Sequence, residues 1–140
     1  MRTTKLLSIL AVLPVLAGTA HAQEADPAAG ESDFKRCRAC HVIADDDGNV
    51  IMKGGKTGPN LYGVIGRTVG TLEGFKYGAS MMAAGEAGIV WDEENLAAYI
   101  TDPKAWLVEV LDDAGAKSKM TYKHKKGAAD MAAYLASTGS

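Results

Sequence analysis

Five consecutive residues, Cys37-Arg38-Ala39-Cys40-His41, bring together two thiols and one imidazole. In a helical turn, residues three and four positions apart lie on one face, so Cys37, Cys40 and His41 would point to the same side. This order of side chains is typical of covalent haem attachment. The chain has no other cysteine. The motif therefore predicts one haem c, bound through thioether bonds to Cys37 and Cys40, with His41 as an axial iron ligand.

Two other kinds of site use a Cys-X-X-Cys pair. A disulfide or thioredoxin-like redox pair is expected in a chain of alternating strands and helices, and no such alternation is visible. A structural zinc site needs four ligands. Besides His41, the residues after position 22 offer only one more histidine, His124, and no further cysteine. Both alternatives fit the chain less well than haem does.

The chain has the size and composition of one small globular domain. It has 140 residues, of which 47% are hydrophobic and 23% are charged. This length is too short for a second domain to be expected. Only 6% of the residues are counted as aromatic, so a large buried cofactor would add apolar surface that a small core lacks.

Residues 1–22 are predicted to be a cleaved signal peptide. Two basic residues precede an apolar stretch over residues 6–16, and Ala20-His21-Ala22 is an A-x-A cleavage signal. The apolar stretch is too short to span a bilayer. Cleavage leaves residues 23–140 as a single domain and removes two basic residues and no acid, which changes the formal net charge from −2 to −4. An exported, acidic protein is not expected to bind nucleic acid.

The periodicity of apolar residues predicts an all-α domain. A polar lead-in over residues 23–30 precedes a helix from about Glu31, in which Phe34, Cys37 and His41 share one face. Later, an aspartate caps each of two further helices. The predicted buried faces are Leu96, Tyr99 and Ile100 after Asp92; Trp106, Leu107, Val110 and Leu111 after Asp102-Pro103, with an end at residues 112–115; and Ala128, Met131, Tyr134 and Leu135 near the C-terminus.

Residues 54–60 are too rich in glycine, proline and asparagine for regular structure. Their Gly-Gly-Lys-Thr sequence suggests a phosphate-binding loop at first sight. That motif requires a glycine where Val50 stands, and a preceding strand, so nucleotide binding is excluded. Residues 45–49 are an acidic turn, and no internal repeat or strand alternation appears in the chain.

The stretch Thr57–Arg67, following a haem-attachment motif, resembles the class I c-type cytochromes. The similarity is to the bacterial, long-form members of the cytochrome c2 family, which are like mitochondrial cytochrome c. Further family landmarks follow in order: Gly74-Phe75-Lys76-Tyr77, Trp91, Tyr99, Asp102-Pro103-Lys104, Lys119-Met120 and Ala133-Tyr134-Leu135. The resemblance implies short helices and loops wrapped around one covalently attached haem. It also implies that the first and last helices cross, with Gly30 and Phe34 against Tyr134.

A second axial ligand to the iron must come from elsewhere in the chain. The candidates are Met52, Met81, Met82, Met120 and Met131, with His124 as a bis-histidine alternative. Met120 is favoured because it lies in a polar, lysine-rich stretch where a core methionine is not expected, and because it matches the ligand position of the family. A thioether ligand raises the reduction potential. His124, in the most basic part of the chain, is predicted to be a solvated surface histidine.

The resemblance also implies supporting roles around the haem. Pro59 would accept a hydrogen bond from the outer nitrogen of His41 and fix its tautomer. Tyr99 would lie against the sulfur of Met120. A cation and hydrogen-bond donors would offset the charge of the haem propionates. The residues that match these propionate-contacting positions are Arg67, Tyr77, Trp91 and Ser118.

The charge distribution suggests how partners are met. Residues 117–126 contain no acid and five lysines: Lys117, Lys119, Lys123, Lys125 and Lys126. Such a face would steer encounters with acidic partners in a salt-dependent way. The resemblance implies a monomeric, periplasmic electron carrier that is not an enzyme. Its donor would be a quinol-oxidising cytochrome bc1 complex, and its acceptor a terminal oxidase, a photosynthetic reaction centre or a periplasmic reductase.

Two other functions would use the same haem differently. A haem peroxidase or gas-binding haem protein needs an open sixth iron site, which requires that Met120 does not bind the iron. A haem subunit held permanently in a larger complex would be favoured by a long apolar surface or a retained anchor, and the sequence shows neither.

Overall fold

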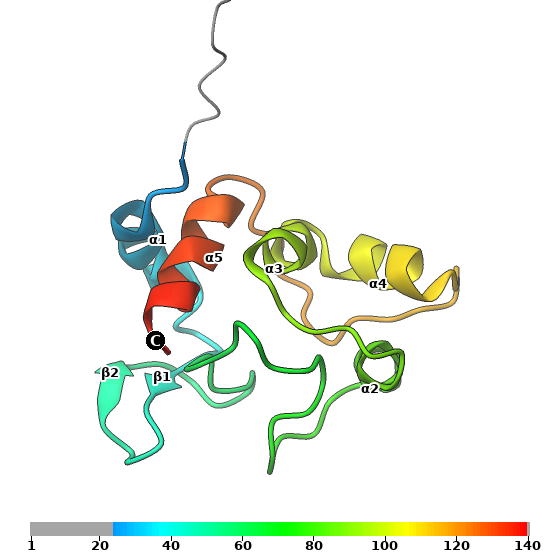
Figure 1. The fold of residues 1–140 in the computed structure, drawn as a ribbon, viewed down its shortest axis with the longest axis horizontal. Helices are drawn as coiled ribbons and strands as arrows, with labels where there is room; N and C mark the ends of the chain where they lie inside the picture. The colour runs from blue at the N-terminus through cyan, green and yellow to red at the C-terminus, as the bar shows by residue number, and fades with distance from the viewer. Residues whose placement is uncertain (1–23, 140) are drawn as a thin grey trace, which may run out of the picture.

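The computed structural model describes residues 24–139, so the predicted signal peptide lies outside the described residues. The chain forms short helices joined by long loops, with one very small sheet (Figure 1). The elements in chain order are α1 (Pro27–Asp33), the 3-10 helix η1 (Phe34–Arg36), β1 (Ile43–Ala44), β2 (Val50–Met52), α2 (Ala79–Glu86), α3 (Glu93–Thr101), α4 (Pro103–Leu111) and α5 (Ala128–Ser137). Within residues 24–139, no helix is long and apolar enough to cross a membrane.

The first helix begins earlier than the sequence pattern indicated. We predicted a lead-in up to residue 30, but α1 starts at Pro27, because the side chain of Asp26 accepts a hydrogen bond from the amide of Ala28 and proline fits the first helical position. The chain then tightens into η1 and a further turn. In that turn, the amides of Cys40 and His41 both donate to the carbonyl of Cys37, at 3.1 and 3.0 Å.

Helices α1 and α5 cross closely, as the family resemblance implied, and lie side by side in Figure 1. A Cβ atom on Gly30 would come within 2.1 Å of the backbone oxygen of Asp130, so only glycine permits this approach. The rings of Phe34 and Tyr134 meet edge to face at 5.9 Å between centroids. The N-terminal and C-terminal segments are therefore locked together beside the Cys37–His41 motif.

The caps predicted for α3 and α4 are confirmed. Asp92 and Asn95 form a reciprocal capping box at the start of α3, and the side chain of Asp102 accepts from the amide of Ala105 at the start of α4. The predicted face of α3 is buried, as are Trp106, Leu107, Met131, Tyr134 and Leu135, whereas Val110, Leu111 and Ala128 are only half-buried. Asp112 ends α4 in the left-handed conformation, with φ of 48°.

Two features of the fold were not predicted. Helix α2 has no side-chain cap and consists of small residues, two methionines and a final glutamate, so it carries little sequence signal. Its position depends on a close approach to another segment, because a Cβ on Gly85 would meet the carbonyl oxygen of Val69 at 2.0 Å. The strands β1 and β2 pair antiparallel around the predicted acidic turn, where Asp45 accepts from the amides of Asp47 and Asn49. Strands this short leave no alternating pattern to read.

Candidate haem-binding site

A cavity of about 450 Å³ lies in the middle of the fold, with a mainly apolar lining. It has the size expected of a cofactor pocket. All ten residues that we predicted to hold or surround the cofactor line this cavity: Cys37, Cys40, His41, Pro59, Arg67, Tyr77, Trp91, Tyr99, Ser118 and Met120. The fold thus brings together residues from widely separated parts of the chain.

His41 is oriented for a ligand role by the loop that follows it. Its Nδ1 lies 2.8 Å from the carbonyl oxygen of Pro59. Since a carbonyl can only accept, Nδ1 carries the proton, and in the neutral ring Nε2 keeps a free lone pair. Burial lowers the pKa of His41, against a smaller opposing effect of the Pro59 hydrogen bond, so the neutral form that binds metals is favoured. A Cβ on Gly58 would lie 2.4 Å from the imidazole Cε1, so this ring position requires glycine.

The environment of the two cysteines bears on whether they form a redox pair or attach a haem. Burial raises the pKa of the Cys37 thiol to about 11, with smaller contributions from the negative charges of Asp33 and Cys40. Reactive redox cysteines have lowered pKa values, so this setting argues against a thioredoxin-like pair. Both cysteines line the cavity, and no disulfide joins them. Two thiols beside an apolar cavity and a neutral imidazole fit a covalently attached haem.

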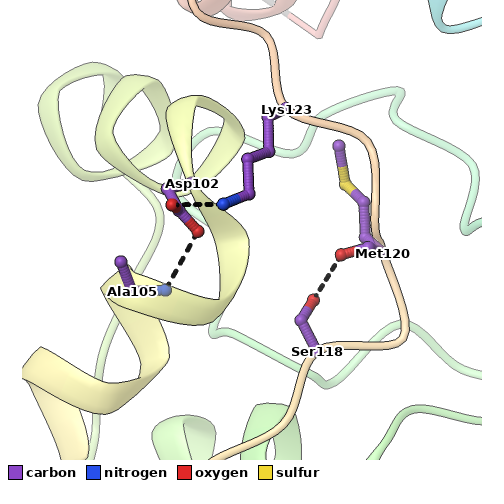
Figure 2. A network of polar contacts seen from close by, with 5 residues as sticks. All are labelled: Asp102, Ala105, Ser118, Met120 and Lys123. Carbon is purple, nitrogen blue, oxygen red and sulfur yellow. Dashed lines mark hydrogen bonds and ion pairs between the residues drawn. The ribbon is translucent and has the colours of Figure 1, made fainter.

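The cavity narrows the choice among the methionines. Met81, Met120 and Met131 line it, whereas Met52 and Met82 are not among its lining residues. Met81 lies in α2, and Met131 is a buried core residue of α5. Met120 instead lies on residues 117–126, a segment without helix or strand that we call the methionine loop. The hydroxyl of Ser118 donates to the carbonyl of Met120 at 2.9 Å (Figure 2).

Arg67 is held by backbone carbonyls at the cavity wall. Its guanidinium donates to the carbonyl oxygen of Asn60 at 3.2 Å and to that of Tyr62. Burial raises the pKa of Tyr77, and the nearby charge of Arg67 partly opposes this increase. The arginine is therefore fixed in place with a positive charge beside a tyrosine hydroxyl, an arrangement that suits an anionic group in the cavity.

Aromatic side chains form the wall near α3 and α4. The ring of Trp91 lies 5.1 Å from each of Tyr99 and Trp106. Burial raises the pKa of Tyr99, and a hydrogen bond with the side chain of Ser118 partly opposes it. Sequence reasoning did not assign several further apolar residues to the site, although the helical periodicity of Leu96 and Ile100 signalled that they are buried. The unassigned apolar lining residues are Leu61, Val64, Phe75, Leu96, Ile100, Leu107 and Leu135.

The prediction for His124 was wrong. Its side chain is 3% exposed and lines the cavity, although its neighbours Lys123 and Lys125 are exposed. The methionine loop turns inward here because the amide of His124 donates to the carbonyl of Ile100 at 2.7 Å. The Nε2 atom lies 3.9 Å from a carboxylate oxygen of Asp33 and has no hydrogen-bond partner in the described part of the chain.

All five lysines of the methionine loop are exposed, but two of them make specific contacts. The ammonium of Lys119 donates to the carbonyls of Lys76 and Tyr77 at 3.2 and 3.4 Å. That of Lys123 lies 2.6 Å from a carboxylate oxygen of Asp102. These two lysines tie the loop to the rest of the molecule.

Comparison with known proteins places the chain and its fold in a known class. No protein-family model matches the chain. Cytochrome c-551 of Roseobacter denitrificans is 52% identical over 134 residues, which cover 96% of this chain and 95% of that protein. Cytochrome c2 of Rhodobacter capsulatus is 54% identical over 123 residues, 88% of each chain.

Solved structures agree with these relatives. A structure of cytochrome c2 isolated from Rhodobacter capsulatus matches with a TM-score of 0.79 at 54% identity, over 80% of this chain and 97% of that one. The cytochrome c2 from Paracoccus denitrificans matches with a TM-score of 0.79 at 52% identity, over 81% and 96% of the two chains.

The fold and the cavity with its cysteine pair are those of a class I c-type cytochrome. Within that class, the chain belongs to the family of cytochromes c2, c-550 and c-551. Its cofactor is one haem c, bound covalently through Cys37 and Cys40. The protein is accordingly a small c-type cytochrome that carries electrons.

Proposed function

We propose that this protein is a periplasmic one-electron carrier in which His41 and Met120 would bind the haem iron. The haem supplies the one-electron redox couple. With His41 and Met120 as ligands, the iron would have no open site for a substrate, so the protein would be a carrier and not an enzyme. Electron transfer is then outer-sphere, between the haem and the redox centre of a docked partner.

The main support for this proposal is that His41 and Met120 line the same cavity. The Pro59 carbonyl holds the proton on Nδ1 of His41 and strengthens Nε2 as a ligand. Of the three methionines that line the cavity, Met120 is the one outside a helix. Met81 and Met131 are committed to the packing of their helices, whereas Met120 is not.

Polar residues on the cavity wall would stabilise the charged edge of the haem. We assign Arg67, Tyr77, Trp91 and Ser118 to the propionates, because a fixed guanidinium and hydrogen-bond donors offset the cost of burying carboxylates. Arg67 is suited to this role because backbone carbonyls already hold its guanidinium in place. Tyr99 would lie against the sulfur of Met120, beside Ser118, with which it shares a hydrogen bond.

The partners are redox complexes with acidic docking surfaces. The donor proposed is a quinol-oxidising cytochrome bc1 complex, and the acceptor is a terminal oxidase, a photosynthetic reaction centre or a periplasmic reductase. The five lysines of the methionine loop would steer these encounters, although the chain as a whole is acidic. Because these lysines are exposed, association is expected to slow as salt increases.

The visible spectrum of the purified holoprotein, with and without carbon monoxide, tests the ligation. We expect a methionine-to-iron charge-transfer band in the oxidised protein and no response of the reduced protein to carbon monoxide. Met120→Ala should abolish the band and open the iron to carbon monoxide. Met81→Ala is the matched control, since Met81 also lines the cavity, and this variant should keep the band.

Prompt binding of carbon monoxide by the native protein would contradict the carrier and support the alternative, a haem peroxidase or gas-binding haem protein with an open sixth site. Loss of the band in Met81→Ala but not in Met120→Ala would move the axial ligand to α2. If the native protein lacked the charge-transfer band and its reduced form did not bind carbon monoxide, the bis-histidine alternative through His124 would be favoured.

A further inference from the structure

The methionine loop is fastened to the molecule on both sides of Met120. Before the methionine, the amide of Lys117 donates to the hydroxyl of Ser80 at 2.9 Å. After it, the amide of His124 donates to the carbonyl of Ile100 at 2.7 Å. Because the loop has no helix or strand of its own, such contacts decide where the methionine lies.

Asp102 provides a further contact for the loop after Met120, next to the bond between His124 and Ile100 (Figure 2). It lies where α3 ends and α4 begins, and its two carboxylate oxygens have different partners. Oδ1 accepts from the amide of Ala105 at 3.2 Å, which caps α4. Oδ2 accepts from the ammonium of Lys123 at 2.6 Å. The helix cap orients the carboxylate, so the lysine meets an acceptor that is already in place.

Two successive loop residues therefore bind one helix end. Lys123 reaches Asp102 through its side chain, and His124 reaches Ile100 through its amide. Lys123 is three residues after Met120, so a shift at this point would be passed directly to the methionine. A short, charge-assisted hydrogen bond at this position restrains the loop more than a solvated lysine would.

We propose that Asp102 and Lys123 are a positioning pair that holds the methionine loop against the junction of α3 and α4, and thereby keeps Met120 at the iron. The inference rests on the proposed function, because it concerns Met120 as the axial ligand. Lys123 is then primarily a structural fastener of the loop, in contrast to Lys125 and Lys126, for which the described residues show no such ion pair.

The test compares five holoprotein variants with the native holoprotein. Lys123→Gln removes the cation, and Asp102→Asn removes the anion while keeping a residue that can cap α4. The double variant removes both charges. Lys104→Gln is the matched control, because Lys104 is an exposed lysine on α4, two residues from Asp102. The readouts are amide hydrogen exchange at His124, the methionine-to-iron charge-transfer band, and the reduction potential.

We expect each single variant to exchange the His124 amide about two- to five-fold faster than the native protein, the range for an exposed ion pair. The charge-transfer band should weaken or disappear at a lower denaturant concentration than in the native protein. The double variant should be no worse than either single one, because the two residues act as a unit. The conservative variant Lys123→Arg keeps the positive charge, so it should retain most of the native exchange rate and the native charge-transfer band.

Additive effects in the double variant, or exchange at His124 that is unchanged in both single variants, would overturn the positioning pair. Faster exchange at His124 with an unchanged charge-transfer band and reduction potential would also overturn it, because the pair would then hold the loop without influencing Met120. A native protein that lacks the band and binds carbon monoxide would instead refute the proposed ligation, and the pair would fall with it. The two failures are therefore distinguishable.

Discussion

His41 and Met120 reach the cavity from segments that the fold supports in different ways. The imidazole follows a helical turn, is packed against Gly58 and donates to Pro59, and the adjoining α1 is locked to α5. The methionine loop has no regular structure and depends on a few hydrogen bonds and an ion pair whose side chains are 45% and 36% exposed.

This difference has a direct consequence for how the site should respond to stress. The histidine side depends on close packing at Gly58, on a part-buried hydrogen bond to Pro59 and on the crossed helices. The exposed hydrogen bonds and the ion pair on the methionine side are weakened by water, by salt and by protonation of the carboxylate. We therefore expect the methionine to be released under conditions that leave the histidine bound.

The largest effect is expected from adding one methyl group beside the imidazole. In Gly58→Ala the new Cβ would lie 2.4 Å from Cε1 of His41, so the ring or the loop must move. We expect loss of most of the holoprotein, with carbon monoxide binding in what remains, as measured by haem content and visible spectra. Gly78→Ala is the control, because its Cβ would make only ordinary contact with the Lys119 side chain at 3.4 Å. A normal spectrum in Gly58→Ala would show that the histidine side is not sterically fixed.

Next in size is a change at the helix crossing. Gly30→Ala would force the backbones of α1 and α5 apart, because the added Cβ would lie 2.1 Å from the Asp130 oxygen. We expect the free energy of unfolding to fall by about 3 kcal/mol, at the upper end of the usual cost of overpacking. Denaturant unfolding of the reduced holoprotein measures this, with Ala29→Ser on the exposed face of α1 as control. Equal losses in the two variants would contradict a specific role for the crossing.

A smaller effect, confined to the methionine side, is expected from Ser118→Ala. It removes the hydroxyl that donates to the Met120 carbonyl at 2.9 Å and should favour local opening of the loop by about 1 kcal/mol. The denaturant dependence of the methionine-to-iron band measures that opening. Ser137→Ala removes a similar bond, to the carbonyl of Tyr134 in α5, and should leave the band unchanged. A matching shift in both variants would mean that the loop does not open separately.

The smallest effect concerns acid. A hydrogen bond from Lys123 is the largest cause of a lowered pKa at Asp102, and the amide of Ala105 and the charge of Lys125 act in the same direction. A lowered folded-state pKa means that the stabilisation is fully present above the ordinary value and is lost as pH falls through the lowered one. We therefore expect His124 amide protection to decrease below about pH 4 in the native protein. In Asp102→Asn this pH dependence should be weaker, and an identical pH profile would show that Asp102 is not the titrating group.

Much of the fold and site was predictable because its signals are local. Aspartate caps at Asp92 and Asp102 and the buried face of α3 follow from spacing within a few residues, and the structure confirms them. The start of α1 was missed because the lead-in was interpreted from its composition, although Asp26 and Pro27 already form a start signal. Helix α2 and the sheet were missed because short elements of small residues carry little pattern of their own.

The cofactor chemistry could be predicted from the sequence alone, because Cys37, Cys40 and His41 lie within one turn and their relation depends only on local backbone geometry. The environments of His124 and Lys123, in contrast, depend on the tertiary structure. His124 is buried because its amide binds Ile100, and Lys123 is an ion-pair partner because Asp102 lies opposite it. Neither result follows from hydropathy, which counts both residues as polar and exposed. Burial and pairing depend on contacts between distant segments, and those exist only once the chain has folded.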